Sequence, residues 1–145
     1  MPRYNMDREL QKFQSQLVKF TANLPERAGE LVTKKVAMDV LAAVVMETPV
    51  DTGRARGNWQ ASVSSPVDST TDKVDKDGET TTYSETIKID GMSVPQGQTI
   101  WITNNVPYIE MLEDGHSPKA PDGIVAPAIH SVRRGSFGTF GGPNA

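Results

Sequence analysis

Apolar side chains recur at helical spacing along the first third of the chain. They return every three or four residues between positions 10 and 24, which places them on one stripe of a helix. Pro25 fits the first turn of a second helix, where its missing N–H is not needed, and we expect that helix to end near Glu47. Residues 36–46 are apolar apart from Asp39. A helix so apolar on all sides predicts a central core helix or, as the less favoured alternative, a helix partly covered by a neighbouring subunit.

Alternating apolar and polar positions predict strands in the middle of the chain. The second helix ends at Thr48-Pro49, because the residue before a proline is pushed out of the α region. Three later segments alternate, at residues 58–63, 83–89 and 99–103, and predict an antiparallel sheet of three to five strands. Residues 64–82 are too polar for a core strand pair, so we expect an exposed β-arm or a loop there.

The C-terminal third predicts two more helices and a tail. A short helix is expected over residues 107–113, with Gly115 as its left-handed cap, and a last helix over residues 124–134. The Gly-rich residues 135–145 show no periodicity and predict a flexible tail. Its Phe137 and Phe140 suit docking against another chain and, equally, packing on their own domain.

These elements together predict an α+β fold. Long N-terminal helices pack on a twisted antiparallel β-sheet, followed by a short helix and a C-terminal helix. A chain of 145 residues fits one domain, which we place at residues 1–134.

Composition narrows the possible partners. The net charge is −3, from 18 acidic and 15 basic residues that are interspersed, so no broad basic face is predicted and we expect at most passive contact with DNA. The longest apolar run, residues 36–46, is far shorter than the roughly 20 residues needed to cross a bilayer, so no membrane contact is expected. The chain has no cysteine, which excludes disulfides and thiolate metal ligands.

Candidate chemistry is sparse. His116 and His130 lie on different predicted elements, whereas zinc needs at least three protein ligands. His116 beside Asp114 or Glu113 could form an acid–base pair, which keeps a small hydrolase or nuclease as an alternative. No nucleophile elbow or phosphate loop is present in the sequence. We therefore predict a protein that is not an enzyme, with no catalytic residue, cofactor or metal.

Charged and aromatic residues around two predicted turns suit an interface instead. Arg54 and Arg56 follow the first turn, and Tyr108, Glu110 and Glu113 surround the short helix. Opposite charges on separate exposed elements can pair across subunits. Pairs within one subunit are an equally weighted alternative.

Two segments carry a family resemblance. The first reads Thr48-Pro49-Val50-Asp51-Thr52-Gly53-Arg54-Ala55-Arg56 and resembles a Pro-Val-Asp-Thr-Gly-x-x-Arg turn after a long helix. The second, residues 104–121, contains Asn104, Pro107-Tyr108, Leu112-Glu113, Gly115, Ser117 and Ala120-Pro121. In this order they resemble the tail-completion family of tailed bacteriophages, which includes minor tail proteins similar to lambda Z, and the match spans roughly residues 28–134.

The resemblance implies a structural protein of the virion neck or tail. Copies would form a ring, commonly sixfold, at the head–tail junction, with other neck, connector and tail proteins as partners, after assembly in the host cytoplasm. A ring that terminates the tail tube is the alternative. The resemblance, the charge pattern and the two aromatic residues of the tail together give these interface candidates: Asp51, Thr52, Gly53, Arg54, Arg56, Pro107, Tyr108, Glu110, Glu113, Gly115, Phe137 and Phe140.

Overall fold

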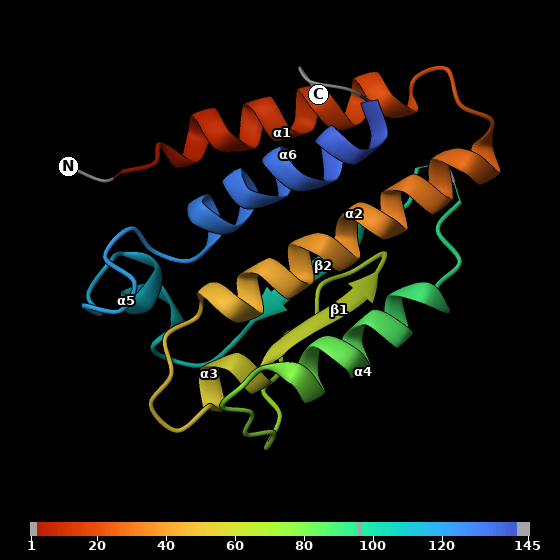
Figure 1. The fold of residues 1–145 in the computed structure, drawn as a ribbon. Helices are drawn as coiled ribbons and strands as arrows, with labels where there is room; N and C mark the ends of the chain where they lie inside the picture. The colour runs from red at the N-terminus through yellow and green to blue at the C-terminus, as the bar shows by residue number, and fades with distance from the viewer. Residues whose placement is uncertain (1–2, 96, 142–145) are drawn as a thin grey trace.

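The computed structural model describes residues 3–95 and 97–141, with the backbone alone for residues 137–141. The chain forms six helices and two strands within these ranges (Figure 1). In order they are α1 (Met6–Thr21), α2 (Glu26–Glu47), α3 (Arg54–Gly57), β1 (Trp59–Val63), α4 (Glu79–Asp90), β2 (Ile100–Asn104), α5 (Ile109–Glu113) and α6 (Val125–Gly141). The predicted α+β class is confirmed.

Helices α1, α6 and α2 form one layer. Helix α6 lies between α1 and α2, so the first and the last helix of the described chain pack side by side (Figure 1). Asn5 caps the start of helix α1. Its side chain accepts a 2.9 Å hydrogen bond from the Arg8 N–H and so satisfies one unpaired donor of the first turn. Phe13, Leu17 and Phe20 of α1 then pack against the buried Val36 and Val132, as their helical spacing predicts.

A buried carboxylate ties α1 to α6. Glu9, only 7% exposed, accepts a 2.6 Å hydrogen bond from Nη1 of Arg133 and lies 3.1 Å from Nδ1 of His130. Arg133 also donates to Gln16 of α1 at 2.8 Å. Burial alone would raise the pKa of Glu9, but the hydrogen bonds from Arg133 and His130 outweigh it and hold the pKa below its usual value of 4.5. The ionised carboxylate therefore stabilises the folded state.

Replacing Glu9 with Gln should make the stability less dependent on acid pH. Because the folded pKa is depressed, the stabilisation by the carboxylate is complete above the unfolded pKa and is lost as pH falls through the folded value. We expect the variant to be less stable by about 1–2 kcal/mol at neutral pH, with the deficit shrinking as pH falls below the unfolded pKa and through the lowered pKa of the folded state. Urea unfolding of both proteins across this range checks it. A deficit that stays constant with pH would contradict the account.

The apolar half of helix α2 lies at the centre of the main hydrophobic core, as predicted. Its Leu41, Val44 and Val45 are at most 2% exposed and pack with Trp59 and Ala61 of β1 and with Ile89, Ile124 and Ala128. That a neighbouring subunit covers part of α2 stays the alternative prediction. Among the described residues, no helix is both long enough and apolar enough to cross a membrane.

The sheet is smaller than predicted. It has two antiparallel strands, with Trp59 opposite Asn104 and Val63 opposite Ile100, so the prediction of three to five strands was wrong. The predicted strand at residues 83–89 is part of helix α4 instead. Helical spacing puts Thr81, Glu85 and Ile89 on the buried face, while Tyr83 and Ile87 are 71% and 53% exposed.

Of the predicted polar insert, residues 64–82, the part at 64–78 is a loop held against the body of the protein and not a β-arm, whereas residues 79–82 belong to helix α4. Buried Asp75 accepts hydrogen bonds from the N–H groups of Gly78 at 3.0 Å and Thr81 at 2.6 Å, and so caps the start of α4. Burial alone would raise the pKa of Asp75, but these hydrogen bonds outweigh it and lower the pKa. The polar composition that predicted an exposed segment is explained by these local bonds.

The last helix is longer than predicted. It continues through residues 135–141, so the expectation of a flexible tail was wrong for that stretch. Ser136 is buried and its hydroxyl donates to Asp39 of α2, a long-range contact that helps hold the extra turns in place. The side chains of Phe137 and Phe140 and all of residues 142–145 lie outside the described part of the structure.

Candidate assembly groove

The first segment of the family resemblance, which we call the first motif, forms a tight turn after α2; the second segment, residues 104–121, is the second motif. Gly53 has φ +91°, and an added Cβ would lie 2.8 Å from the backbone carbon of Asp75. The Asp75 N–H donates a 3.0 Å hydrogen bond to the Gly53 carbonyl. Only glycine combines this left-handed conformation with so close a backbone approach.

Arg56 stabilises this turn from within the chain. Its guanidinium donates to the carbonyls of Thr48 at 3.0 Å, Met46 at 3.1 Å and Lys76 at 2.7 Å. The first two of these bonds satisfy carbonyl groups at the C-terminal end of α2. Buried Thr48 also stabilises this end, because its hydroxyl donates to the Val44 carbonyl at 2.6 Å and accepts from Nε1 of Trp59 at 2.8 Å. Arg56 is thus already occupied by backbone acceptors, and we assign it to the fold instead of an interface.

Glu113 and Gly115 of the second motif also shape the fold. The Glu113 carboxylate accepts from the N–H groups of Ile124 at 3.0 Å and Val125 at 3.1 Å, where it caps the start of α6 and meets the positive end of its dipole. Gly115 has φ +84°, as predicted for a left-handed cap, and an added Cβ would lie 2.5 Å from the Pro121 carbonyl oxygen.

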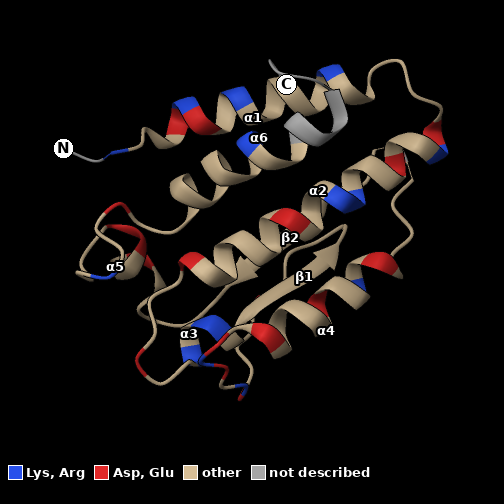
Figure 2. Ribbon diagram, in the orientation of Figure 1, with Lys and Arg blue, Asp and Glu red and all other residues tan. Residues whose placement is uncertain are grey.

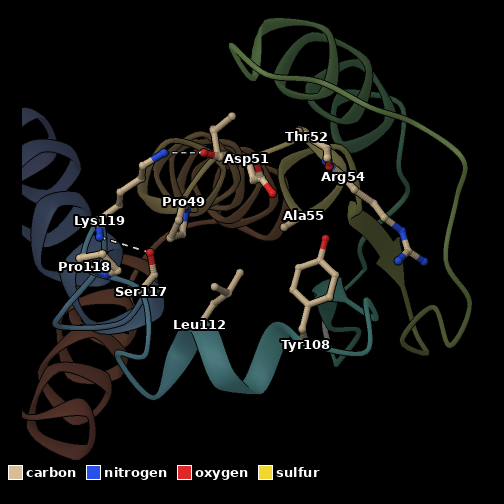
Figure 3. Close-up of a pocket in the computed structure, with 12 residues that line it drawn as sticks. Pro49, Asp51, Thr52, Arg54, Ala55, Tyr108, Leu112, Ser117, Pro118 and Lys119 are labelled. Atoms are coloured by element: carbon tan, nitrogen blue, oxygen red, sulfur yellow. Dashed lines mark hydrogen bonds between the residues drawn. The ribbon is translucent and has the colours of Figure 1, made fainter.

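The two motifs meet across a groove of about 470 Å³. Tyr108 and Leu112 point into it from one side, and Pro49 and Ala55 lie opposite (Figure 3). The other residues lining the groove are Val50, Asp51, Thr52, Gly53, Arg54, Ser117, Pro118 and Lys119. Segments more than fifty positions apart in the sequence therefore form one surface.

Two side chains join the walls of the groove. Nζ of Lys119 donates to the Val50 carbonyl at 2.7 Å, and the side-chain amide of Asn104 donates to the Ala55 carbonyl at 2.8 Å. Our sequence reasoning missed Lys119 and Leu112 as lining residues. The resemblance contained Leu112 and Asn104 within its pattern, but no charge or spacing signal marked Lys119.

Charges around the groove include several that the described chain leaves unpaired. Arg54 is exposed and its side chain extends away from the groove (Figure 3), while Asp51 and Glu110 are also exposed. Among the described residues, none of these three side chains has a hydrogen-bond or ion-pair partner. Figure 2 shows basic residues on α3 and acidic residues elsewhere around it. The groove therefore combines apolar walls with available charges of both signs.

The residues considered for chemistry are not brought together. His116 is exposed beside the groove, whereas His130 contacts Glu9 and the Tyr4 ring on the α1–α6 side. The carboxylate of Glu113, one possible partner of His116, is bonded to the start of α6. In residues 3–95 and 97–141 no group of three or more His, Asp or Glu side chains is placed to hold a metal ion.

Of the other candidates, Thr52 accepts a 3.2 Å hydrogen bond from the Arg54 N–H, and Pro107 is exposed in the turn before α5. The arrangement suits recognition of another protein surface: a partly buried aromatic side chain, apolar walls and a charged rim. No known protein family, curated protein or solved structure matches this chain.

Proposed function

We propose that this protein is a structural component of a tailed-phage virion that joins the head to the tail as one subunit of a ring. The observation that supports it is the groove between the two segments of the resemblance, because both segments contribute lining residues to that one surface. The sixfold number of copies rests on the resemblance alone.

A closed ring needs contacts between two different surfaces of identical subunits. The groove offers one such surface, with the Tyr108 ring and Leu112 available to an apolar side chain from the next copy. Arg54 and Glu110, exposed and unpaired among the described residues, provide charges of both signs beside the groove, which set the register against opposite charges on the other surface of the next copy. Arg56 and Glu113, which serve the fold, do not take part.

Charge reversal tests this division of roles. Arg54→Glu and Glu110→Arg should each weaken association of the protein by roughly tenfold, since each opposes like charges across the contact, and the double variant should lose more than either single variant. Sedimentation of each variant at rising concentration, alone and with neck proteins, measures it. Lys12→Glu, at an exposed position of α1, is the matched control and should leave association unchanged. Equal association of both single variants and the unaltered chain would refute the proposed pairing.

A further inference from the structure

Strand β2 leaves one edge of the sheet open. The Ser64 N–H donates to the Thr99 carbonyl at 2.9 Å, which with the register of the two strands makes Ser62 and Trp101 a hydrogen-bonded pair. The N–H and C=O groups of Ile100 and Ile102 then point away from β1. Within the described ranges, no group is hydrogen-bonded to them, and no third strand lies beside β2.

The opposite edge of the sheet is closed. The outward N–H of Ala61 in β1 donates a 2.9 Å hydrogen bond to Oε1 of Glu85, a side chain of α4 that is only 4% exposed. Lys88 in turn pairs with the same carboxylate oxygen at 2.8 Å. The fold therefore satisfies one edge with a buried side chain and leaves the other without such cover.

The sequence of β2 does not protect its edge. Exposed edge strands usually carry lysine, proline or another charge that blocks pairing with a second chain. Residues 99–103, Thr-Ile-Trp-Ile-Thr, have none of these and are all favourable in strands. Trp101 is 39% exposed, on the sheet face opposite the core. Since a two-stranded sheet is marginal by itself, an added strand would satisfy the open edge and widen the sheet.

We propose that the open edge of β2 binds β2 of a second copy of this chain, antiparallel about a two-fold axis at Trp101, to form a continuous four-stranded sheet. In this register Ile100 lies opposite Ile102 of the second copy, and their outward donors and acceptors bond one another. Trp101 lies opposite Trp101 of the second copy on the open face. Thr99 lies opposite Thr103, so the pairs are apolar with apolar and polar with polar.

Charge and side-chain pairing favour this occupant and this register. Residues 99–103 are uncharged, so two copies meet with no like charges opposed. Centring the pair on Ile102 would set apolar Ile100 against Asn104, whose amide is already bonded to the Ala55 carbonyl at 2.8 Å. The interface uses no residue that lines the groove. It is also independent of the proposed function, because the open edge is present whatever the protein assembles into.

A single cysteine tests the axis directly. The chain has no cysteine of its own, and the Cα atoms of a non-hydrogen-bonded pair lie about 4.5 Å apart, within the range of a disulfide. Trp101→Cys should therefore form a covalent dimer under mild oxidation. Tyr83→Cys, on the exposed face of α4, should stay monomeric under the same conditions. Failure of Trp101→Cys to cross-link, or equal cross-linking of both variants, would overturn the proposal.

Two measurements on protein without a disulfide give a second test. Sedimentation of the unaltered chain should show a monomer–dimer equilibrium that Trp101→Lys weakens by at least about tenfold, while Tyr83→Lys leaves it unchanged. Hydrogen exchange of the Ile100 and Ile102 amides should slow as the dimer forms. A ring or other assembly in which these two amides still exchange fast would overturn the strand pairing and leave the proposed function standing.

Discussion

Replacing Gly53 with Ala should lower the free energy of unfolding by about 2–4 kcal/mol. A side chain at φ +91° is strained in itself. The added Cβ would also meet three backbone atoms of Asp75 and Lys76 at 2.8 to 2.9 Å, and a backbone cannot move aside as a flexible side chain can. The turn and the loop that docks on it must shift together, and the groove wall with them.

Gly29 supplies the matched control. It lies inside α2, and an added Cβ there meets nothing within 4 Å. Gly29→Ala should therefore stabilise the protein by about 0.5–1 kcal/mol through helix propensity. Urea unfolding of both variants measures the contrast. Similar effects of the two substitutions would contradict the role of Gly53 in the turn.

Replacing Tyr108 with Ala should weaken assembly by at least about thirtyfold, as expected for a central aromatic contact worth about 2 kcal/mol or more. The Tyr108 side chain points into the groove (Figure 3), is partly buried, and its hydroxyl has no hydrogen-bond partner among the described residues. Removal of the Tyr108 side chain should change the free energy of unfolding little. Sedimentation with neck proteins measures assembly, and urea unfolding measures the fold.

Tyr83→Ala is the control for Tyr108→Ala, because it removes the same side chain from α4, where it is 71% exposed. It should leave assembly unchanged. Equal losses of assembly in the two variants, or a loss of assembly that follows a drop in stability, would show that the groove is not part of the assembly surface.

Helical periodicity predicted α1 well, because a stripe of apolar residues over about four turns fits no strand. The bounds of α2 were predicted from Pro25 at its start and Thr48-Pro49 at its end. The pattern failed at residues 83–89. There, alternation is also compatible with a helix that buries Glu85 and Ile89 four residues apart. The Asp75 side chain favours the helix by capping its start, but this contact forms only when the loop is folded against α4 and cannot be predicted from the local sequence pattern. The continuation of α6 past residue 134 is accompanied by the hydrogen bond from Ser136 to Asp39 of α2, a long-range contact that the glycine content of this stretch does not reveal.

The sequence located the candidate site by segment and not by residue. It singled out Arg54, Arg56, Glu110 and Glu113 as charges that could pair across subunits. The fold divides them, since carbonyl groups at the end of α2 occupy Arg56 and the first N–H groups of α6 occupy Glu113. These partners are backbone groups, which every residue carries and which composition cannot reveal. Arg54 and Glu110 are exposed, and neither side chain has such a partner among the described residues.

Electron microscopy of the virion with this chain labelled tests the central claim most directly. The account predicts the label in a ring at the head–tail junction, and heads and tails that accumulate separately when the chain carries Tyr108→Ala. Label absent from that junction in complete, infectious particles would contradict it.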